Sequence, residues 1–227
     1  MAKLLIIDTA LEEALVALSK DGKIICELNN KETHSHASFI QLAIEKLLQD
    51  QQMKISELDA IAVTLGPGSY TGLRVGLATA KGIAYALQKP LIGLSTLSAL
   101  ASAAIDLASN STVPPYQIFS MIDARRMEVF GAIYDASLKP IVQEQAMVLD
   151  QTKWDSLIMQ STICIGNGHF KTKDFNSSYQ VSYFDGSYTS QVLANLAMAK
   201  WASREFEDLA YVGPNYLKDV YILPGKM

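Results

Sequence analysis

Two aspartates, Asp8 and Asp123, each stand at the end of an apolar stretch that has the length of a β-strand. They occur in "IIDTA" near the N-terminus and in "SMIDARR" in the second half of the chain. Carboxylate oxygens are ligands that Mg²⁺ prefers, so two such groups across a cleft could hold a metal–nucleotide complex. The alternative is structural, because aspartates at strand ends often cap the turn that follows.

The turns after these aspartates help to choose between the two interpretations. In the actin-like ATPase and sugar-kinase superfamily, paired aspartates hold a magnesium nucleotide, and glycines in the following hairpins let the backbone approach the phosphates. Here the hairpins read "ALEE" (10–13) and "ARRM" (124–127), without glycine. Side chains at these positions would crowd the phosphates. We therefore interpret Asp8 and Asp123 as blunted remnants of a nucleotide site and expect no bound cofactor and no catalytic residue.

The loop "GPGSYTGLRVG" (66–76) is the other segment with the composition of a binding site. It lacks the Gly-Lys-Ser/Thr of a Walker loop, and the spacing of a dinucleotide fingerprint would need glycine where Thr71 stands. Four small residues, Gly72, Gly76, Ala80 and Ala84, share one side of the predicted helix that follows. Glycine inside a helix costs up to about 1 kcal/mol relative to alanine. The pattern favours very close packing on this stripe over direct contact with phosphate.

Two predicted helices, 38–48 and 70–87, carry more apolar residues than one buried face requires. We predict that the surplus meets a partner protein, with two helices from each subunit forming a four-helix bundle. The expected interface residues are Phe39, Ile40, Ala43, Leu47, Gly72, Val75, Gly76, Thr79, Ala80 and Ile83. The alternative is that the small-residue stripe packs inward on its own sheet.

No metal site is expected. His34 and His36 are two residues apart, so their rings would diverge on a helix, and His169 follows a turn alone. We expect the three histidines to be solvated in turns. Cys26 and Cys164 lie in apolar strand-like runs and are expected to be buried and reduced.

Composition limits the classes of protein to which the chain could belong. The chain has 227 residues, 49% of them hydrophobic, and a net charge of −4 without an extended basic run. Strong binding to nucleic acid needs clustered cations, so any contact with RNA is expected to be indirect. The apolar runs are too short for a signal peptide or a membrane span, which predicts a cytoplasmic protein.

The chain divides at the linker-like "SNSTVPP" (109–115) into residues 1–110 and 111–227. Each half begins with strands in quick succession and then adds helices, which indicates an α/β fold built from two similar lobes. A long helix is predicted over 188–206, in the second half, and it could pack back on the N-terminal lobe.

Several of these segments, in order, resemble the TsaB (YeaZ) family. They are "IIDTALEEALVAL", "HSHAS", "GPGSYTGLRVGLATAKGIA", "GLSTLSALA" and "IDARRMEVF". The resemblance spans the chain and is densest from 1 to about 135. Towards the end, "GNG" (166–168) and "PNYLKD" (214–219) are similar to the family, whose members more often carry arginine at the position of Lys218.

The resemblance implies an actin-like (ASKHA) fold of two ribonuclease-H-like lobes with mixed sheets. It also implies a non-catalytic subunit that dimerises with TsaD, or with itself when alone, through helices of the N-terminal lobe. The family acts with TsaD, a TsaE-type ATPase and a TsaC-type synthase to install threonylcarbamoyl on the adenosine next to the anticodon of tRNA. The alternative function is an actin-like ATP-dependent phosphotransferase or ATPase that uses Asp8 and Asp123.

Overall fold

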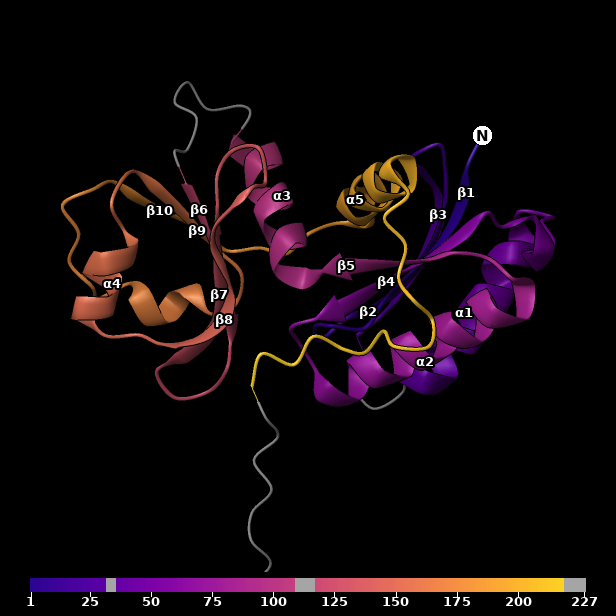
Figure 1. Ribbon diagram of the computed structural model, residues 1–227, viewed down its shortest axis with the longest axis horizontal. Helices are drawn as coiled ribbons and strands as arrows, with labels where there is room; N and C mark the ends of the chain where they lie inside the picture. The colour runs from indigo at the N-terminus through magenta and orange to yellow at the C-terminus, as the bar shows by residue number, and fades with distance from the viewer. Residues whose placement is uncertain (32–35, 109–116, 219–227) are drawn as a thin grey trace, which may run out of the picture.

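The computed structural model describes residues 1–31, 36–108 and 117–218, which form two α/β lobes joined side by side (Figure 1). The N-terminal lobe contains β1 (Lys3–Asp8), β2 (Ala14–Lys20), β3 (Lys23–Asn30), α1 (His36–Asp50), η1 (Ile55–Glu57), β4 (Ala60–Gly66), α2 (Tyr70–Leu87), β5 (Leu91–Ser95) and α3 (Thr96–Ala108). The rest of the chain forms β6 (Gln117–Asp123), β7 (Glu128–Tyr134), β8 (Pro140–Val148), α4 (Gln151–Leu157), β9 (Thr162–Ile165), η2 (His169–Thr172), β10 (Val181–Phe184) and α5 (Ser190–Ser203).

The two sheets have the same topology. The strand order is β3-β2-β1-β4-β5 in the first sheet and β8-β7-β6-β9-β10 in the second. In each, the first three strands along the chain pair antiparallel, and the next two join parallel to the opening strand. This repeated order confirms the prediction of two ribonuclease-H-like lobes with mixed sheets.

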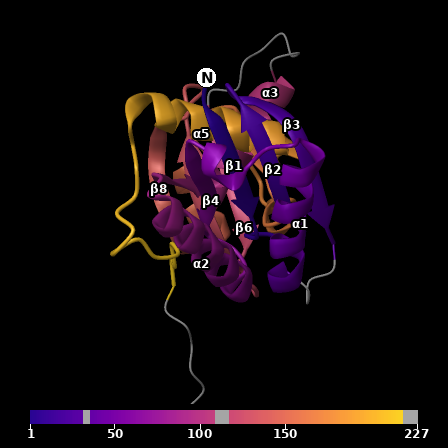
Figure 2. The same ribbon diagram turned by 90° about the vertical axis from the view of Figure 1, so that its right-hand side faces the viewer.

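The lobes stack into alternating layers of helix and sheet. Figure 2 shows α1 and α2 side by side in front of the first sheet, while α3 and α5 lie on its other face, towards the second lobe. The second sheet follows, and α4 and η2 cover its outer face. Strands β1 and β4 are buried along almost their whole length because helices cover both faces of their sheet, which explains their continuous apolar runs.

Helix α5 is shorter than the predicted helix 188–206 and packs on the first sheet and on α3, away from the strands that precede it in the sequence. Its apolar residues belong to the central core between the two sheets, together with those of α3. None of the described helices is long and apolar enough to cross a membrane.

A segment without regular secondary structure, residues 204–218, follows α5 and is called the strap here. It runs across the N-terminal lobe and along α2 towards the second lobe (Figure 1, yellow). The N–H of Glu207 donates to the carbonyl of Leu91 in β5 (2.8 Å), and the N–H of Asn215 donates to the carbonyl of Leu65 in β4 (2.7 Å). The strap therefore lies against the β5 side of the first sheet.

Candidate functional site

Asp8 lies at the end of β1 and is almost completely buried, with 4% of its surface exposed. Its Oδ1 accepts hydrogen bonds from the hydroxyl of Thr64 (2.6 Å) and from the N–H of Ala10 (2.9 Å). Thr64 reaches the carboxylate because β4 pairs with β1 in parallel, so both side chains meet at the carboxyl ends of their strands. These contacts are those of an aspartate that caps a turn and ties two strands together.

Tyr188, in the segment before α5, also lies against this carboxylate. The pKa of the Tyr188 hydroxyl is raised well above its ordinary value, first by burial and then by the negative charge of Asp8. The tyrosine comes from the far end of the chain, which is why sequence reasoning missed it. Its phenol group occupies part of the space in front of Asp8.

Asp123 has different surroundings, because its side chain is 37% exposed and is paired with Lys171 from η2. Its Oδ1 also accepts a hydrogen bond from the N–H of Arg125 (2.7 Å), and Lys171 donates a second bond to the carbonyl of Glu128 (2.7 Å). Partial burial by itself raises the pKa of Asp123, but the hydrogen bonds from Lys171 and Arg125 and their charges hold it below the ordinary value. The negative charge of Asp123 is therefore balanced by Lys171, and its hydrogen bond from the N–H of Arg125 stabilises the β6–β7 turn.

The β6–β7 turn has an unusual backbone. Arg125 and Arg126 both have positive φ angles, 69° and 48°, in the left-handed region that favours glycine. The sequence lacks glycine here, yet the turn follows a backbone path of the kind glycine would allow. Both arginine side chains are exposed.

A cleft of about 620 Å³ lies between the lobes, and Asp8 lines it but Asp123 does not. The carboxylates along it are Asp8, Glu12, Glu13 and Glu27, and Lys31 is the lysine that faces them. The two glutamates of the "ALEE" turn thus do project into this space. An excess of negative charge opposes the binding of phosphates. Within the described residues, no three His, Cys, Asp or Glu side chains are arranged to hold a metal ion.

The glycine-rich loop and the start of α2 pack on the turn between β1 and β2. The N–H of Ser69 donates to the carbonyl of Ala10 (2.7 Å), and the hydroxyl of Thr9 donates to the carbonyl of Gly72 (2.7 Å). A Cβ atom on Gly72 would lie 2.1 Å from the carbonyl oxygen of Thr9, and one on Gly76 would lie 2.3 Å from its Oγ1. These glycines are required because the helix touches the lobe's own first strand.

This placement corrects part of the predicted interface. Six of its ten residues face the first sheet and are buried inside the N-terminal lobe, so they present no surface to a partner. They are Ile40, Ala43, Leu47, Gly72, Gly76 and Ala80. A spacing of four residues shows that side chains share one side of a helix, but it does not say whether that side faces inward or outward.

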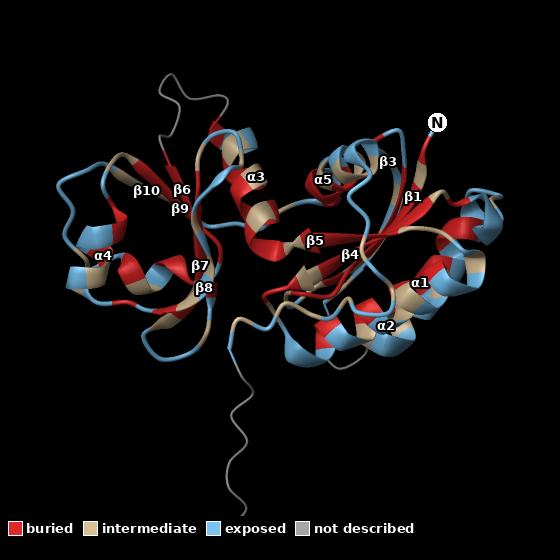
Figure 3. Ribbon diagram, viewed as in Figure 1, coloured by how far each residue is buried: buried red, intermediate tan, exposed pale blue. Residues whose placement is uncertain are grey.

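The other four predicted residues, Phe39, Val75, Thr79 and Ile83, are partly exposed at the outer surface of the two helices. Figure 3 shows α1 and α2 buried towards the sheet and exposed on the outside. Three more small or apolar residues are exposed there: Leu42, which is 66% exposed, Gly82 and Ala86. We call these seven residues the outer face: Phe39, Leu42, Val75, Thr79, Gly82, Ile83 and Ala86.

The histidines and cysteines differ from the expectation in part. His169 is buried, not solvated, and its Nε2 lies 2.7 Å from Oδ1 of Asp185. His34 is outside the described residues, and so is the side chain of His36. Cys164 is buried as expected, whereas Cys26 is only partly buried, and both are free thiols.

Comparison with known proteins agrees with this geometry. The family model described as "TsaD: tRNA N6-adenosine threonylcarbamoyltransferase" matches residues 24–220. The Escherichia coli "tRNA threonylcarbamoyladenosine biosynthesis protein TsaB" is 27% identical, over 99% of this chain and 99% of that protein. The Bacillus subtilis protein of the same name is 32% identical, over 64% of this chain and 62% of the relative.

A solved structure, "YeaZ from Pseudomonas aeruginosa", has a TM-score of 0.79 and 25% identity, and the match covers 96% of this chain and 100% of that one. The sequence match and the structural match each cover nearly the whole chain. The chain belongs to the TsaB (YeaZ) family.

Proposed function

We propose that this chain is a non-catalytic subunit that binds a TsaD-type transferase and activates it. The general role, in tRNA threonylcarbamoyladenosine biosynthesis, follows from membership of the TsaB family. The reaction it supports attaches threonylcarbamoyl to the adenosine next to the anticodon. A TsaE-type ATPase joins the larger assembly, and the isolated chain pairs with itself.

The observation that carries this proposal is the outer face of α1 and α2. Leu42 is exposed on α1, and Val75, Thr79 and Ile83 recur every four residues along α2. Gly82 has open space around it, because a Cβ atom there would meet nothing within 4 Å. An exposed glycine weakens a helix, so its presence favours close approach by another molecule. Two such helices suit the pairing of helices across an interface.

The cleft supports the non-catalytic part of the proposal. The carboxylate of Asp8 accepts hydrogen bonds from Thr64 and Ala10, and that of Asp123 pairs with Lys171. Neither is free to take a metal-bound phosphate without breaking contacts that hold strands or turns together. An actin-like phosphotransferase would need both carboxylates at one nucleotide, whereas only Asp8 lines the cleft.

The interface is tested by measuring affinity for the TsaD-type protein of the same organism by calorimetry. Leu42→Glu and Gly82→Leu should each weaken binding about tenfold or more, which corresponds to about 1.4 kcal/mol. Met159→Glu is the matched control, since Met159 is equally exposed (69%) but lies after α4 in the second lobe. Unchanged affinity of both outer-face variants, with native melting temperatures, would show that the partner binds elsewhere. Gel filtration of the same variants tests whether the homodimer uses this face.

The non-catalytic role is tested with Asp123→Asn, which removes the charge but keeps the size of the side chain. The variant should stimulate the partner's formation of threonylcarbamoyladenosine as well as the native chain does. A large loss of stimulation, with partner binding intact, together with micromolar binding of magnesium-ATP by the native chain, would instead favour the phosphotransferase.

A further inference from the structure

Helix α2 presents a second exposed surface, on the side next to the strap. Tyr70, Arg74, Lys81 and Tyr85 are spaced four, seven and four residues apart, so they share one side of the helix and point away from the small residues of the outer face. Lys81 reaches the strap through a hydrogen bond from its Nζ to the carbonyl of Val212 (3.0 Å). One helix thus separates an apolar surface near α1 from an aromatic and basic surface near the strap.

The start of α2 and the end of the strap form an aromatic stack. The rings of Tyr70 and Tyr216 are stacked with their centroids 5.1 Å apart. The guanidinium of Arg74 lies over the Tyr70 ring at 5.1 Å and donates a hydrogen bond to its hydroxyl (2.8 Å). Both tyrosines remain more than 40% exposed, so this stack is a surface feature and not part of the core.

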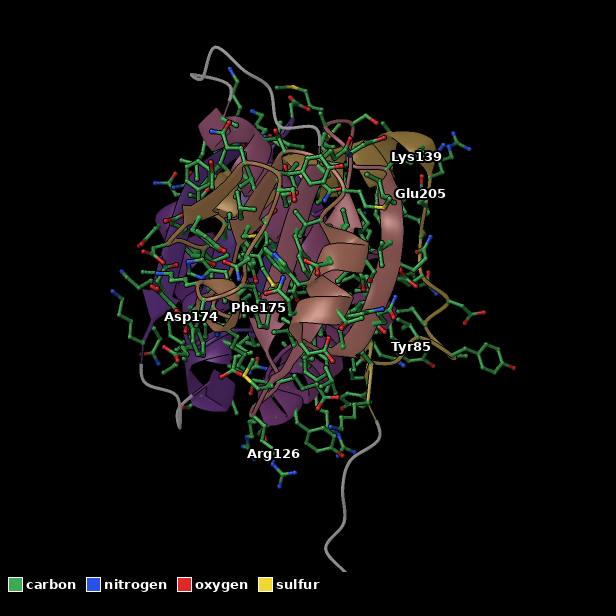
Figure 4. The ribbon with its side chains drawn as sticks, turned by 90° about the vertical axis from the view of Figure 1, so that its left-hand side faces the viewer. Tyr85, Arg126, Lys139, Asp174, Phe175 and Glu205 are labelled. Carbon is green, nitrogen blue, oxygen red and sulfur yellow. The ribbon has the colours of Figure 1, made fainter. Side chains whose placement is uncertain are left out.

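Lys218, two residues after Tyr216, connects this stack to the β6–β7 turn. Its ammonium group pairs with the carboxylate of Glu128, whose N–H donates to the carbonyl of Arg125 (3.1 Å). Two residues of chain span about 7 Å at most, so the stack and the turn belong to one surface. Figure 4 shows Arg126, from the β6–β7 turn, extending away from the body of the molecule.

The cations of this surface exceed the carboxylates that touch them. Asp123 and Glu128 are each paired with a lysine, Lys171 and Lys218. Among the described residues, Arg74, Arg125 and Arg126 form no salt bridge. Three unpaired arginines gather here on a chain whose net charge is −4. We call the exposed set the basic patch: Tyr70, Arg74, Arg125, Arg126, Tyr216 and Lys218.

We propose that the basic patch binds RNA directly, with the arginines and Lys218 on the phosphate backbone and the exposed tyrosines beside bases or ribose. Cations interleaved with exposed aromatic rings are the combination that binds nucleic acid backbones and bases together. The left-handed backbone at Arg125 and Arg126 is costly for residues other than glycine. This backbone directs two exposed arginine side chains from adjacent positions of one turn.

The patch is too long for a single small phosphate, because it extends from the start of α2 to the tip of the β6–β7 turn. An acidic protein would satisfy the cations but would not require the tyrosine stack. The inference rests on the proposed function, since a tRNA-modifying assembly brings RNA to this chain. It replaces the expectation of purely indirect contact, which considered only runs in the sequence. Arg74, Arg125 and Lys218 are far apart in the sequence, and the fold brings them to one surface through Tyr70, Tyr216 and Glu128.

The test uses the full chain and a fluorescently labelled, unmodified tRNA transcript that reads a codon beginning with adenosine. Arg125→Gly/Arg126→Gly removes two charges and relieves the turn, so its melting temperature should equal or exceed that of the native chain. RNA affinity, measured by anisotropy across a salt series, should fall about tenfold or more. The slope of log K against log salt should become shallower by roughly 0.7 to 0.9 for each lost contact.

Lys20→Gln/Lys23→Gln is the matched control, because it removes two exposed cations from the β2–β3 turn at the opposite end of the first sheet. It should leave RNA affinity unchanged. Equal losses in both double variants, or no loss in the arginine variant, would overturn the proposal. So would displacement of the RNA by inorganic phosphate at low millimolar concentration, which would indicate a small-anion site.

Binding to the TsaD-type partner separates this proposal from the proposed function. The arginine variant should bind that partner normally, while Gly82→Leu should bind RNA normally and the partner weakly. If the arginine variant instead loses the partner and keeps RNA, the patch is a protein contact and the RNA inference is wrong, although the subunit role stands.

Discussion

The two lobes share one strand order but cover the outer faces of their sheets in different ways. In the N-terminal lobe, α1 has 15 residues and α2 has 18, and α2 approaches β1 so closely that only glycine fits at Gly72 and Gly76. In the second lobe, the cover is α4 with seven residues and η2 with four. There the space is filled by Trp154, whose ring lies 6.4 Å from Phe119 and 5.7 Å from Phe175.

This difference indicates that the outer layer of the second lobe serves stability, whereas that of the N-terminal lobe can also serve recognition. In the second lobe, a short helix and a single 3₁₀ turn cover the sheet, and large aromatic side chains fill the space beneath them. These short elements offer no long helical surface to a partner. The N-terminal lobe uses two long helices held by small residues, and their outer sides remain available. The same topology therefore gives one lobe whose outer layer mainly completes a core, and one whose outer layer can also carry a partner.

The largest effect is expected from Trp154→Ala. Trp154 is fully buried, and its removal leaves a cavity in the outer core of the second lobe. Truncating a buried aromatic side chain to alanine costs about 3–5 kcal/mol, which chemical denaturation would measure. Affinity of the remaining folded protein for the TsaD-type partner should be unchanged. Weaker partner binding by the fully folded variant would contradict this division between the lobes, because it would give the second lobe a role in recognition.

Gly76→Leu should have the next largest effect, and on stability more than on binding. The leucine would have to displace Thr9 and the β1–β2 turn, and overpacking of this kind typically costs about 1–3 kcal/mol. Thermal melting of the variant alone is the measurement. A native melting temperature combined with lost partner binding would mean that α2 turns its glycine stripe outward in solution, contrary to the structure.

The smallest expected effect is a pair of glycine-to-alanine substitutions, which should change stability in opposite directions on the two sides of α2. Gly76→Ala places a methyl group 2.3 Å from Oγ1 of Thr9 and should lower stability, while Gly82→Ala meets no atom. The second change should raise stability by up to about 1 kcal/mol, since alanine is the better helix former. Paired urea titrations of the two variants would detect the difference, and equal shifts would contradict the assignment of inner and outer faces.

Much of the fold could be predicted from the sequence, because it rests on local patterns. The apolar run of β4, the glycine loop and the helical spacing after it placed α2 at the residues where it occurs. The need for close packing at Gly72 and Gly76 also followed from local spacing. The direction of that packing did not, since a periodic pattern has no information about which face meets the sheet.

The site depended on contacts between distant residues and was therefore less predictable. Asp8 and Asp123 were singled out correctly as strand-end carboxylates, but their partners Tyr188 and Lys171 come from later elements whose position only the fold determines. His169 was placed wrongly in solvent for the same reason. Its 3₁₀ turn packs on β6, and the ring of Tyr183 from β10 lies beside the His169 ring.

The strap also has a consequence for how the protein is made. The edge of β5 is covered by residues near Glu207, and the inner face of the first sheet by α5, so both covers are synthesised after the strands that they protect. Until then the nascent chain carries "LIGLS" as an open strand edge, which is a template for pairing with other chains. Deletion of residues 204–218 should thus produce a protein that aggregates, because it leaves the edge of β5 open.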